Sequence, residues 1–410
     1  MPSLYSLDDL GAGRLAGRRV IVRVDFNVPL RDGEVMDTTR LEESLPTLRE
    51  LSAAGARLVL ISHCGRPKGQ RDPRYSLAPV AGKLSELLGR PIPFATDCVG
   101  EPARAVVESL GDGEICLLEN LRFHAGETSN DPAFADQLAS LGEVFVGDAF
   151  GTAHRAHASV VGIAERLPAK AAGRLLSREV EALGHLLGSP DRPFVGVLGG
   201  AKIGGKIDTL ENLLPRLDVL LLGGGMANTF LAAQGHGMAS SLVEPERIEL
   251  ASTILERAEA SETRVLLPTD LVVTDDLGEP KRIETVAAAS IPRDMMAVDI
   301  GTDTRTAFVV ECQKAGTLFW NGPLGVFETP PFHQGTSAVA EGLVGCSGFT
   351  VIGGGETVAA VRRAGVAERL GHISTGGGAS LELLAGKPLP GVTILEKEGI
   401  LANQGETHDG

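Results

Sequence analysis

The chain has 410 residues, which is more than one typical hydrophobic core accommodates, so we expect two or three domains. Its formal net charge of −15 argues against a general nucleic-acid-binding protein, so an anionic ligand would need basic residues gathered locally. The five cysteines are scattered without a CxxC pair, which is typical of reduced cytoplasmic thiols. The first ten residues lack the basic segment and the apolar stretch that are typical of a signal peptide, and no apolar run reaches membrane-spanning length. We therefore expect a cytoplasmic protein with no membrane partner and no nucleic-acid partner.

The first half of the chain alternates strand-like and helix-like segments. Apolar and β-branched runs predict strands at residues 19–28, 58–62, 115–118 and 144–146, and helical spacing predicts helices at 40–51 and 77–88. This alternation predicts an open parallel sheet, whose ligands lie beyond the carboxyl ends of the strands.

Polar residues follow every one of these predicted strands. Four arginines come from four separate loops, together with one histidine: Arg40, Arg66, Arg122, Arg155 and His63. A single arginine after a strand is usually a solvated surface residue, and a lone histidine is more often a packed or capping residue. Four planar guanidinium groups at one sheet edge instead suit carboxylate or phosphate. We therefore predict an anion site in the first half.

Residues 170–187 have apolar side chains at helical spacing and are followed by Gly188-Ser189-Pro190, which ends a helix. Strands before this segment end in charged and amide side chains, whereas strands after it end in glycine clusters. An ordinary core helix within one domain would show the same spacing. The contrast between the two halves favours a helix that connects two domains facing each other.

The second half predicts strands at 194–198, 219–222, 265–267, 271–273, 317–320, 350–352 and 372–374, and a helix at 379–384. Glycine clusters stand at most of the strand-to-helix turns, where backbone N–H groups attract phosphate. None of the clusters fits GxGxxG, which removes the main support for a dehydrogenase. The second half is therefore interpreted as a nucleotide domain.

A P-loop is the rival interpretation of the first glycine cluster. Residues 200–206 fit the spacing GxxxxGK, but Ile207 stands where a P-loop has the serine or threonine that holds magnesium. Lys202 and Lys206 are four residues apart at a predicted helix start, so they are expected to share one helical face and reach the same phosphates.

The chain closely resembles the phosphoglycerate kinase family. The segments that carry the resemblance run from Arg23 to Glu382 in the family's order: RVDFNVPL, SHCGRP, ENLRFHAGE, DAFGTAHRAHAS, LGGAKIGGKI, ENLLPRLDVLLLGGGMANTF, AQGH, LLPTD, FWNGPLGVFE, GGGETVAAV and ISTGGGASLE. The resemblance implies reversible phosphoryl transfer in glycolysis from 1,3-bisphosphoglycerate to ADP, giving 3-phosphoglycerate and ATP, with Mg²⁺. It also implies a monomer.

The resemblance implies an α/β fold of two Rossmann-like parallel-sheet domains joined by a linker helix, with a cleft between them. Residues 1–170 would bind 3-phosphoglycerate, 171–188 would form the linker or hinge helix, and 189–389 would bind the nucleotide. The C-terminal tail, residues 390–410, would pack back on the first domain.

Site residues are carried over motif by motif. The 3-phosphoglycerate site would comprise Asp25, Phe26, Asn27, Arg40, His63, Cys64, Gly65, Arg66, Arg122 and Arg155. The nucleotide site would comprise Lys202, Lys206, Asn321, Glu328 at the ribose, Gly354, Gly355, Glu356 and Thr357, with Glu356 also holding the metal. The catalytic groups would be Arg40, Lys202, Lys206 and the glycines Gly376, Gly377 and Gly378 at a helix start.

Several positions depart from the family's usual pattern. Glu356 replaces the usual aspartate at the metal, and Gly204-Gly205 replaces a more polar pair between the two lysines. A catalytically inactive anion-binding scaffold with the same fold is a further alternative, which Glu356 leaves open. The arginine, lysine and glycine sets favour the enzyme.

Overall fold

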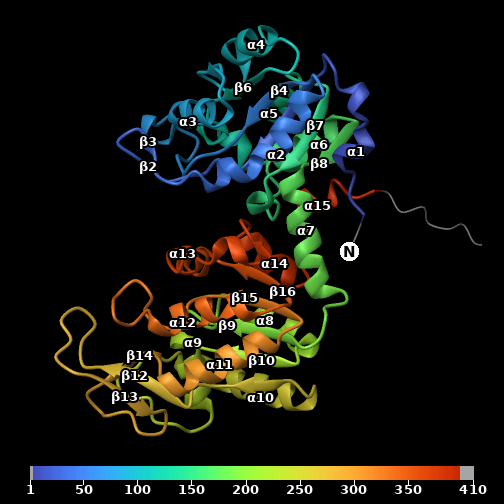
Figure 1. Cartoon of the computed structure of the whole chain (residues 1–410). Coiled ribbons are helices and arrows are strands. Elements are labelled where there is room, and N and C mark those ends of the chain that lie inside the picture. The colour runs from blue at the N-terminus through green and yellow to red at the C-terminus, as the bar shows by residue number, and fades with distance from the viewer. Residues whose placement is uncertain (1–2, 398–410) are drawn as a thin grey trace, which may run out of the picture. The chain divides into compact units, whose positions relative to one another are not determined.

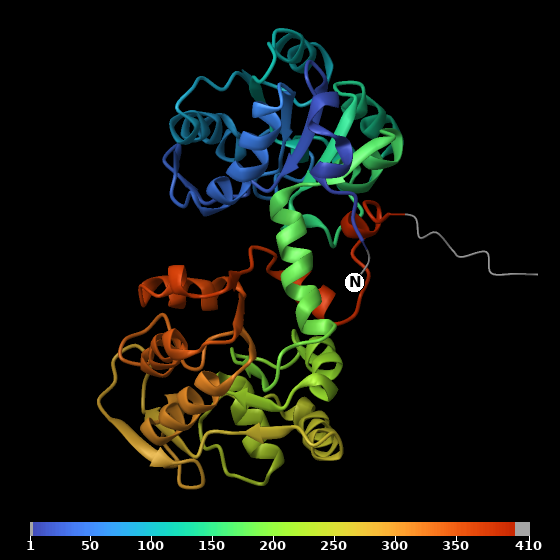
Figure 2. The same cartoon turned by 45° about the vertical axis from the view of Figure 1, so that its right-hand side comes forward.

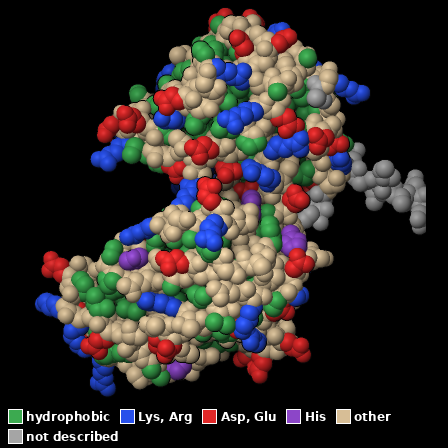
Figure 3. Space-filling view, viewed as in Figure 1, with side chains coloured by type: hydrophobic (Ala, Val, Ile, Leu, Met, Phe, Trp, Pro, Cys, Tyr) green, Lys and Arg blue, Asp and Glu red, His purple; other side chains and the backbone are tan. Residues whose placement is uncertain are grey.

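The computed structural model describes residues 3–397, which form two compact units (Figure 1). The first unit runs to Arg178 and includes the described residues from Leu389 onward, and the second comprises Glu179–Pro388. The boundary falls inside one helix, α7 (Arg174–Leu187). On the face in Figure 3, acidic and basic side chains are interspersed on both units, so no single patch there carries the negative charge.

The first unit is built on a six-stranded sheet in the order β5-β6-β4-β1-β7-β8, in which every neighbouring pair is parallel. Its strands are β1 (Arg19–Val24), β4 (Arg57–Ile61), β5 (Phe94–Ala95), β6 (Ile115–Leu118), β7 (Val144–Asp148) and β8 (Ala169–Ala172), with a hairpin of β2 (Leu30–Arg31) and β3 (Glu34–Val35). Its remaining helices are α1 (Leu7–Leu10), α2 (Thr39–Ala53), α3 (Ala78–Leu88), α4 (Gly100–Glu108), α5 (Pro132–Ala139), α6 (Ile163–Arg166) and α15 (Pro390–Thr393).

The second unit contains another six-stranded parallel sheet, in the order β11-β10-β9-β15-β16-β17. Its strands are β9 (Phe194–Leu198), β10 (Val219–Leu222), β11 (Arg264–Leu266), β15 (Thr317–Asn321), β16 (Phe349–Gly353) and β17 (His372–Ile373). The helices are α8 (Ile207–Leu213), α9 (Gly224–Ala233), α10 (Ile248–Ala260), α11 (Thr302–Lys314), α12 (Gln334–Gly342), α13 (Gly355–Arg363) and α14 (Gly378–Leu384). Figures 1 and 2 show helices flanking the parallel sheet of each unit.

Each sheet buries side chains on both faces, as parallel strands require. Val20 and Val22 of β1 pack in one core with the leucines of α2, while Ile21 between them is equally buried and points to the opposite face. In the second unit, Val197 and Trp320 pack in a core with α11, α12 and α13. The predicted α/β fold with two parallel sheets is confirmed.

The predicted helix over 170–187 is wrong at its N-terminal end. Ala169–Ala172 instead form β8, which pairs with β7 and completes the first sheet. The carboxylate of Asp148, at the end of β7, accepts hydrogen bonds from the backbone N–H groups of Leu175 (2.9 Å) and Leu176 (3.2 Å). Because this carboxylate satisfies N–H groups of a first helical turn, α7 begins only at Arg174.

A small antiparallel sheet in the second unit was not predicted. It has the order β13-β12-β14, with β12 (Asp270–Thr274), β13 (Ile283–Ala287) and β14 (Met296–Ile300). The predicted strand at 271–273 therefore belongs to this sheet and not to the parallel one. Leu271 and Val273 pack with Leu231 of α9 in a separate small core.

The C-terminal segment up to residue 397 belongs to the first unit. The backbone N–H of Tyr5 donates to the carbonyl of Leu395 (2.9 Å), and that of Gly391 donates to the carbonyl of Ala153 (2.8 Å). The rest of the tail, residues 398–410, lies outside the described residues, so the expectation for it stays a prediction. Among residues 3–397, no helix is long and apolar enough to cross a membrane.

Candidate functional site

A charged network lies at the carboxyl ends of the central strands of the first sheet. Arg23 Nη2 donates to His63 Nδ1 (3.1 Å), so this nitrogen is the acceptor of a neutral imidazole. Arg40, from the first turn of α2, donates a hydrogen bond to Asp25 Oδ2. The other carboxylate oxygen of Asp25 lies 3.7 Å from His63 Nδ1. Loops that are distant in sequence thus meet at one sheet edge.

Four guanidinium groups act on the same imidazole. Burial lowers the pKa of His63 well below its ordinary value, and the positive charges of Arg23, Arg122, Arg155 and Arg40 lower it further. Burial likewise lowers the pKa of Arg122 to about 10, with the charges of Arg155 and Arg23 adding to the effect. The structure therefore brings together Arg40, Arg122, Arg155 and His63, as the sequence predicted.

Hydrogen bonds to backbone groups fix the loops that carry this network. Asn120 Oδ1 accepts from the N–H groups of Cys64 (3.1 Å) and Arg122 (3.0 Å), and Asn120 Nδ2 donates to the Cys64 carbonyl (2.7 Å). Asn27 Oδ1 accepts from the Gly65 N–H (2.9 Å), while Arg122 Nη1 donates to the Gly65 carbonyl (2.6 Å). The Arg122 fork is consequently held in one orientation.

Three other predicted residues contribute differently. The side chains of Phe26 and Cys64 are buried in the hydrophobic core of the first unit, and burial raises the pKa of the Cys64 thiol to about 11. Their backbone, not their side chains, belongs to the site loops. Arg66 is exposed, and within residues 3–397 its guanidinium forms no hydrogen bond or ion pair.

The second unit has a cavity of about 240 Å³ at the carboxyl ends of its parallel strands. Glycines of the turns after β9 and β10 line it, together with residues after β15 and β16: Gly200, Gly224, Gly225, Pro323, Leu324, Gly325, Val326, Glu328 and Glu356. The strand order changes direction between β9 and β15, which is where ligands bind in open α/β sheets.

Lys206 lies against the turns beside this cavity. Its Nζ donates to the carbonyls of Gly199 (2.6 Å) and Asn321 (2.9 Å), which leaves one N–H free. Burial lowers the pKa of Lys206 to about 8, and the nearby charge of Glu356 partly opposes this. A Cβ at Gly322 would lie 2.3 Å from the ammonium, so a side chain there would exclude the lysine.

Asn321, Thr357 and the Gly353–Gly355 turn form one small assembly. The Gly322 N–H donates to Thr357 Oγ1 (2.6 Å), which ties α13 to the end of β15. Asn321 Nδ2 is buried and has no hydrogen-bond partner among the described residues. A Cβ at Gly354, where φ is +87°, would lie 3.0 Å from this nitrogen. An unpaired amide donor therefore faces the glycine turn.

The predicted pairing of two lysines on one helical face is wrong. Lys206 immediately precedes α8, and Lys202 lies four residues earlier in an irregular segment because Gly204 and Gly205 form a turn between them. Lys202 is exposed and does not line the cavity. Glu328 and Glu356 are both exposed at its rim.

The glycines at the start of α14 lie close to a buried carboxylate of α7. Glu179 accepts from the Thr375 backbone N–H (2.6 Å) and from its hydroxyl (2.8 Å). The Gly376 N–H donates to Ser374 Oγ (3.1 Å), whereas a Cβ at Gly377 or Gly378 would meet nothing within 4 Å. Gly377 and Gly378 thus border open space.

Known proteins resemble this chain in sequence and in fold. The family model described as phosphoglycerate kinase matches residues 7–387. The chain belongs to the phosphoglycerate kinase family. The phosphoglycerate kinase of Desulforudis audaxviator is 53% identical over 383 residues, covering 93% of this chain and 97% of the relative. One from Thermus thermophilus is 54% identical with the same coverage.

Solved structures agree with these relatives. The phosphoglycerate kinase of Coxiella burnetii matches with a TM-score of 0.87 at 38% identity, covering 96% of this chain and 98% of that one. The enzyme from Pyrococcus horikoshii matches with a TM-score of 0.80 at 32% identity and the same coverage. The chain is accordingly a phosphotransferase with a carboxyl group as acceptor, and the alternatives of a P-loop NTPase and an inactive scaffold are not favoured.

Two charged residues that lie at the sites of this phosphoglycerate kinase family member were not predicted from the sequence. Arg23 is buried within β1, and its position inside a β-branched run was the available signal. Asp299, at the cavity wall, accepts from the Gly335 N–H (2.6 Å) and from Arg305 Nη2 (3.1 Å). Burial raises the pKa of Asp299 to about 7, although these donors oppose the shift.

The apolar walls of the cavity were also missed. They come from Leu242, Leu271, Leu277, Met296 and Val326. Three of these residues belong to the antiparallel sheet or its connecting turn, so their proximity to the glycine turns follows from tertiary structure alone.

Proposed function

We propose that this chain transfers a phosphoryl group reversibly between 1,3-bisphosphoglycerate and ADP, giving 3-phosphoglycerate and ATP in glycolysis. The observation that carries the proposal is the cluster of arginines around His63 in the first unit: Arg23 contacts the imidazole, and the charges of Arg40, Arg122 and Arg155 lower its pKa further. Arg23 and Arg122 are buried, whereas Arg40 and Arg155 are partly exposed. Asp25 and Glu127 supply two negative charges against these four positive ones, so the cluster favours an anionic ligand. A substrate with a carboxylate and a phosphate supplies two anions to planar donor forks.

In the first unit, the guanidinium groups would bind 3-phosphoglycerate. The buried Nε of Arg122 has no hydrogen-bond partner among the described residues, so a donor remains for the ligand. His63 is neutral and offers Nε2–H, because its Nδ1 accepts from Arg23. Asp25 fixes Arg40, while Asn27 fixes the Gly65 turn. The substrate would thus meet donors that are already oriented.

In the second unit, the cavity would bind ADP or ATP. Its apolar walls suit a purine base, and Glu328 at the rim can accept hydrogen bonds from ribose hydroxyls. Lys206 and the glycine turns lie beside the same cavity and would bind the phosphates. The unpaired Nδ2 of Asn321, near Gly354, is a further donor for a nucleotide oxygen.

Glu356 is the residue that would hold Mg²⁺. Its carboxylate is exposed at the cavity rim and forms no hydrogen bond or ion pair within residues 3–397, which fits a hard cation that keeps several waters. When bound, Mg²⁺ supplies positive charge to the nucleotide phosphates. The side chain of Glu356 is one methylene group longer than that of aspartate. A bent rotamer, or a water molecule between carboxylate and metal, would accommodate the extra length.

Transfer requires no general base, because the attacking oxygen is an anionic phosphate in one direction and a carboxylate in the other. Positioning and charge stabilisation then supply the rate enhancement. We assign the stabilising charge to Arg40 and Lys202, assisted by Lys206 and by the backbone at Gly376–Gly378. Since the two substrates would bind to different units, we propose that hinge bending brings them together for transfer. We further propose that the protein is a cytoplasmic monomer.

Two measurements test this proposal together. A coupled assay should detect ATP from 1,3-bisphosphoglycerate and ADP, and calorimetry should detect binding of 3-phosphoglycerate and of ADP separately. Arg122→Gln should lower the affinity for 3-phosphoglycerate about tenfold to a hundredfold, because one charge-assisted hydrogen bond is lost. The affinity for ADP should be unchanged. Arg31→Gln, at an exposed arginine in the same unit, is the matched control.

The alternatives predict different results. A P-loop NTPase would hydrolyse ATP at a rate independent of 3-phosphoglycerate, and a scaffold would bind both substrates without forming ATP. Either result would refute the proposed reaction.

A further inference from the structure

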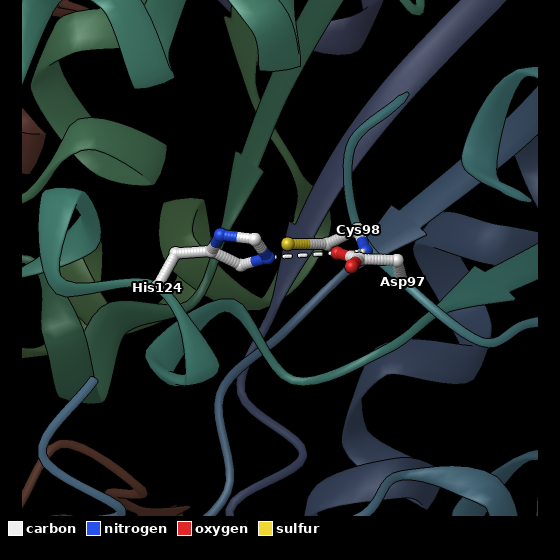
Figure 4. A group of neighbouring side chains, drawn as sticks. All are labelled: Asp97, Cys98 and His124. Carbon is white, nitrogen blue, oxygen red and sulfur yellow. Dashed lines mark hydrogen bonds and ion pairs between the residues drawn. The ribbon is translucent and has the colours of Figure 1, made fainter. Parts of the chain in front are cut away.

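A second cluster of potential ligands lies in the first unit, apart from the residues assigned to the glycerate site. Asp97 and Cys98 lie between β5 and α4, and His124 lies between the short turns Leu121–Phe123 and Ala125–Glu127. Figure 4 shows the three side chains pointing toward one another from these separate segments. One carboxylate oxygen, the thiol sulfur and one imidazole nitrogen all lie within 4.8 Å of one another.

The three groups are held in place by contacts that do not depend on an ion. The imidazole of His124 stacks on Phe134, with ring centroids 5.1 Å apart and an interplanar angle of 25°. Asp97 Oδ1 accepts from the backbone N–H of Cys98 (2.7 Å) and lies 2.7 Å from His124 Nε2. The ligand atoms are thus preorganised, and Asp97 Oδ2 forms no hydrogen bond within residues 3–397.

We propose that Asp97, Cys98 and His124 bind one divalent transition-metal ion of the zinc type. A thiolate, an imidazole and a carboxylate are three ligands that Zn²⁺ accepts, and three protein ligands leave a fourth position for water. The soft sulfur disfavours Mg²⁺ and Ca²⁺, which take oxygen ligands. The site is therefore different in chemistry from the one assigned to Glu356.

Metal binding would draw the three ligand atoms toward tetrahedral spacing. The sulfur, now within 4.8 Å of the other two atoms, would lie about 3.6 Å from them with a zinc–sulfur bond of about 2.3 Å. Tetrahedral zinc with bonds of about 2.0–2.1 Å to nitrogen and oxygen places those two atoms about 3.4 Å apart. The present separation of 2.7 Å between His124 Nε2 and Asp97 Oδ1 would therefore widen by about 0.7 Å, or Oδ2 would bind instead. The ion thus replaces the hydrogen bond between the two side chains.

His124 and Asp97 form the solvent-exposed side of the site. The side chains of His124 and Asp97 are 32% and 34% exposed, whereas Cys98 is fully buried. An open depression beside His124 is lined by Ser129, Asp131 and Gln137. On binding, the sulfur–metal bond forms as the sulfur–hydrogen bond breaks, and the proton passes to solvent. The ion would then link the segment after β5 to the one after β6.

Cobalt titration of the full-length protein tests the site. Protein is freed of metal with a chelator, kept free of nucleotide, and titrated with Co²⁺, which replaces Zn²⁺ and reports a thiolate ligand through a near-ultraviolet charge-transfer band. We expect the band to saturate at one equivalent of Co²⁺ and to disappear when Zn²⁺ is added. A carboxylate site such as Glu356 gives no such band, so the result is independent of the proposed kinase activity.

Matched variants assign the ligands. Cys98→Ser should abolish the band, whereas Cys116→Ser, at a buried cysteine of β6, should retain it. Asp97→Asn keeps the size of the side chain and should weaken Co²⁺ binding more than about tenfold. Zn²⁺ should raise the melting temperature of the wild type but not that of Asp97→Asn. No band in the wild type, a band in Cys98→Ser, or unchanged affinity in Asp97→Asn would overturn the proposal.

Discussion

The ammonium group of Lys206 should give nucleotide binding a defined pH dependence. Burial lowers the pKa of Lys206 from 10.5 to about 8, with Glu356 opposing the shift. In the free protein, the charged fraction of this lysine then falls from about 0.9 at pH 7 to about 0.1 at pH 9. If the charged form binds the phosphates, the apparent Kd for ADP rises about tenfold over this interval.

Calorimetry of ADP binding at pH 7, 8 and 9 measures this effect directly. Phosphate groups, with a second pKa near 6, have finished titrating in this range and do not contribute. Lys206→Met should bind ADP more weakly at pH 7 and lose the pH dependence. Lys314→Met, at an exposed lysine at the end of α11 outside the nucleotide site, is the matched control and should leave both the affinity and its pH dependence unchanged.

Two results would refute this reasoning. An affinity of the wild type that stays constant from pH 7 to pH 9 would mean that Lys206 does not titrate there or does not contact the phosphates. A tenfold change that persists in Lys206→Met would assign the titration to another group.

Four further predictions concern the remaining groups. Arg40→Ala should lower kcat about a thousandfold, as for comparable arginines in phosphoryl transfer, and steady-state kinetics should show no such loss for the exposed control Arg31→Ala. Affinity for 3-phosphoglycerate, measured by calorimetry, should fall as ionic strength or sulfate concentration rises, and a flat response would count against capture by the guanidinium groups. Glu356→Asp should lower the Mg²⁺ concentration that gives half-maximal rate without changing glycerate affinity; an unchanged requirement, with full activity in Glu356→Gln, would remove this residue from the metal site. Burial raises the pKa of Asp299 to about 7, so its carboxyl group keeps its proton in the folded protein between about pH 4 and pH 7. The contribution of Asp299 to the free energy of unfolding therefore falls as pH rises through that window. In scanning calorimetry, the melting temperature of Asp299→Asn should therefore rise relative to that of the wild type from pH 5 to pH 8. A difference in melting temperature that stays constant with pH would contradict the assignment.

The basic cluster was largely predictable from sequence because most of its members follow a strand that has a clear signal. β1, β4, β6 and β7 are short apolar runs with distinct ends, and parallel strands bring their carboxyl ends to one edge of the sheet. The side chains of His63 and Arg122 follow such runs by only a few residues. Arg23 escaped prediction because it lies inside the run and not after it, although a charged residue within a β-branched run was an available signal.

The apolar part of the cavity could not be predicted in the same way. Leu242, Leu271 and Met296 are hydrophobic residues that nothing in the sequence distinguishes from core residues. They reach the cavity because β12 and β14 pair antiparallel beside α9, and this pairing depends on contacts between distant segments. Residues 170–172 were predicted as helix for a related reason: alanine favours helices locally, and pairing with β7 overrides that preference.

The two units neutralise anions by different means, and this difference separates their responses to solution conditions. The first unit presents guanidinium groups to its ligand. Burial lowers the pKa of Arg122 to about 10, but even this arginine stays mostly protonated up to pH 9. The second unit presents backbone N–H groups, which carry no net charge, together with Lys206, which titrates near pH 8. Binding of 3-phosphoglycerate should therefore respond strongly to salt and little to pH between 7 and 9. Nucleotide binding should respond to pH in the same range, so the loss of overall rate at alkaline pH should appear in the KM for ADP before it appears in the KM for the glycerate.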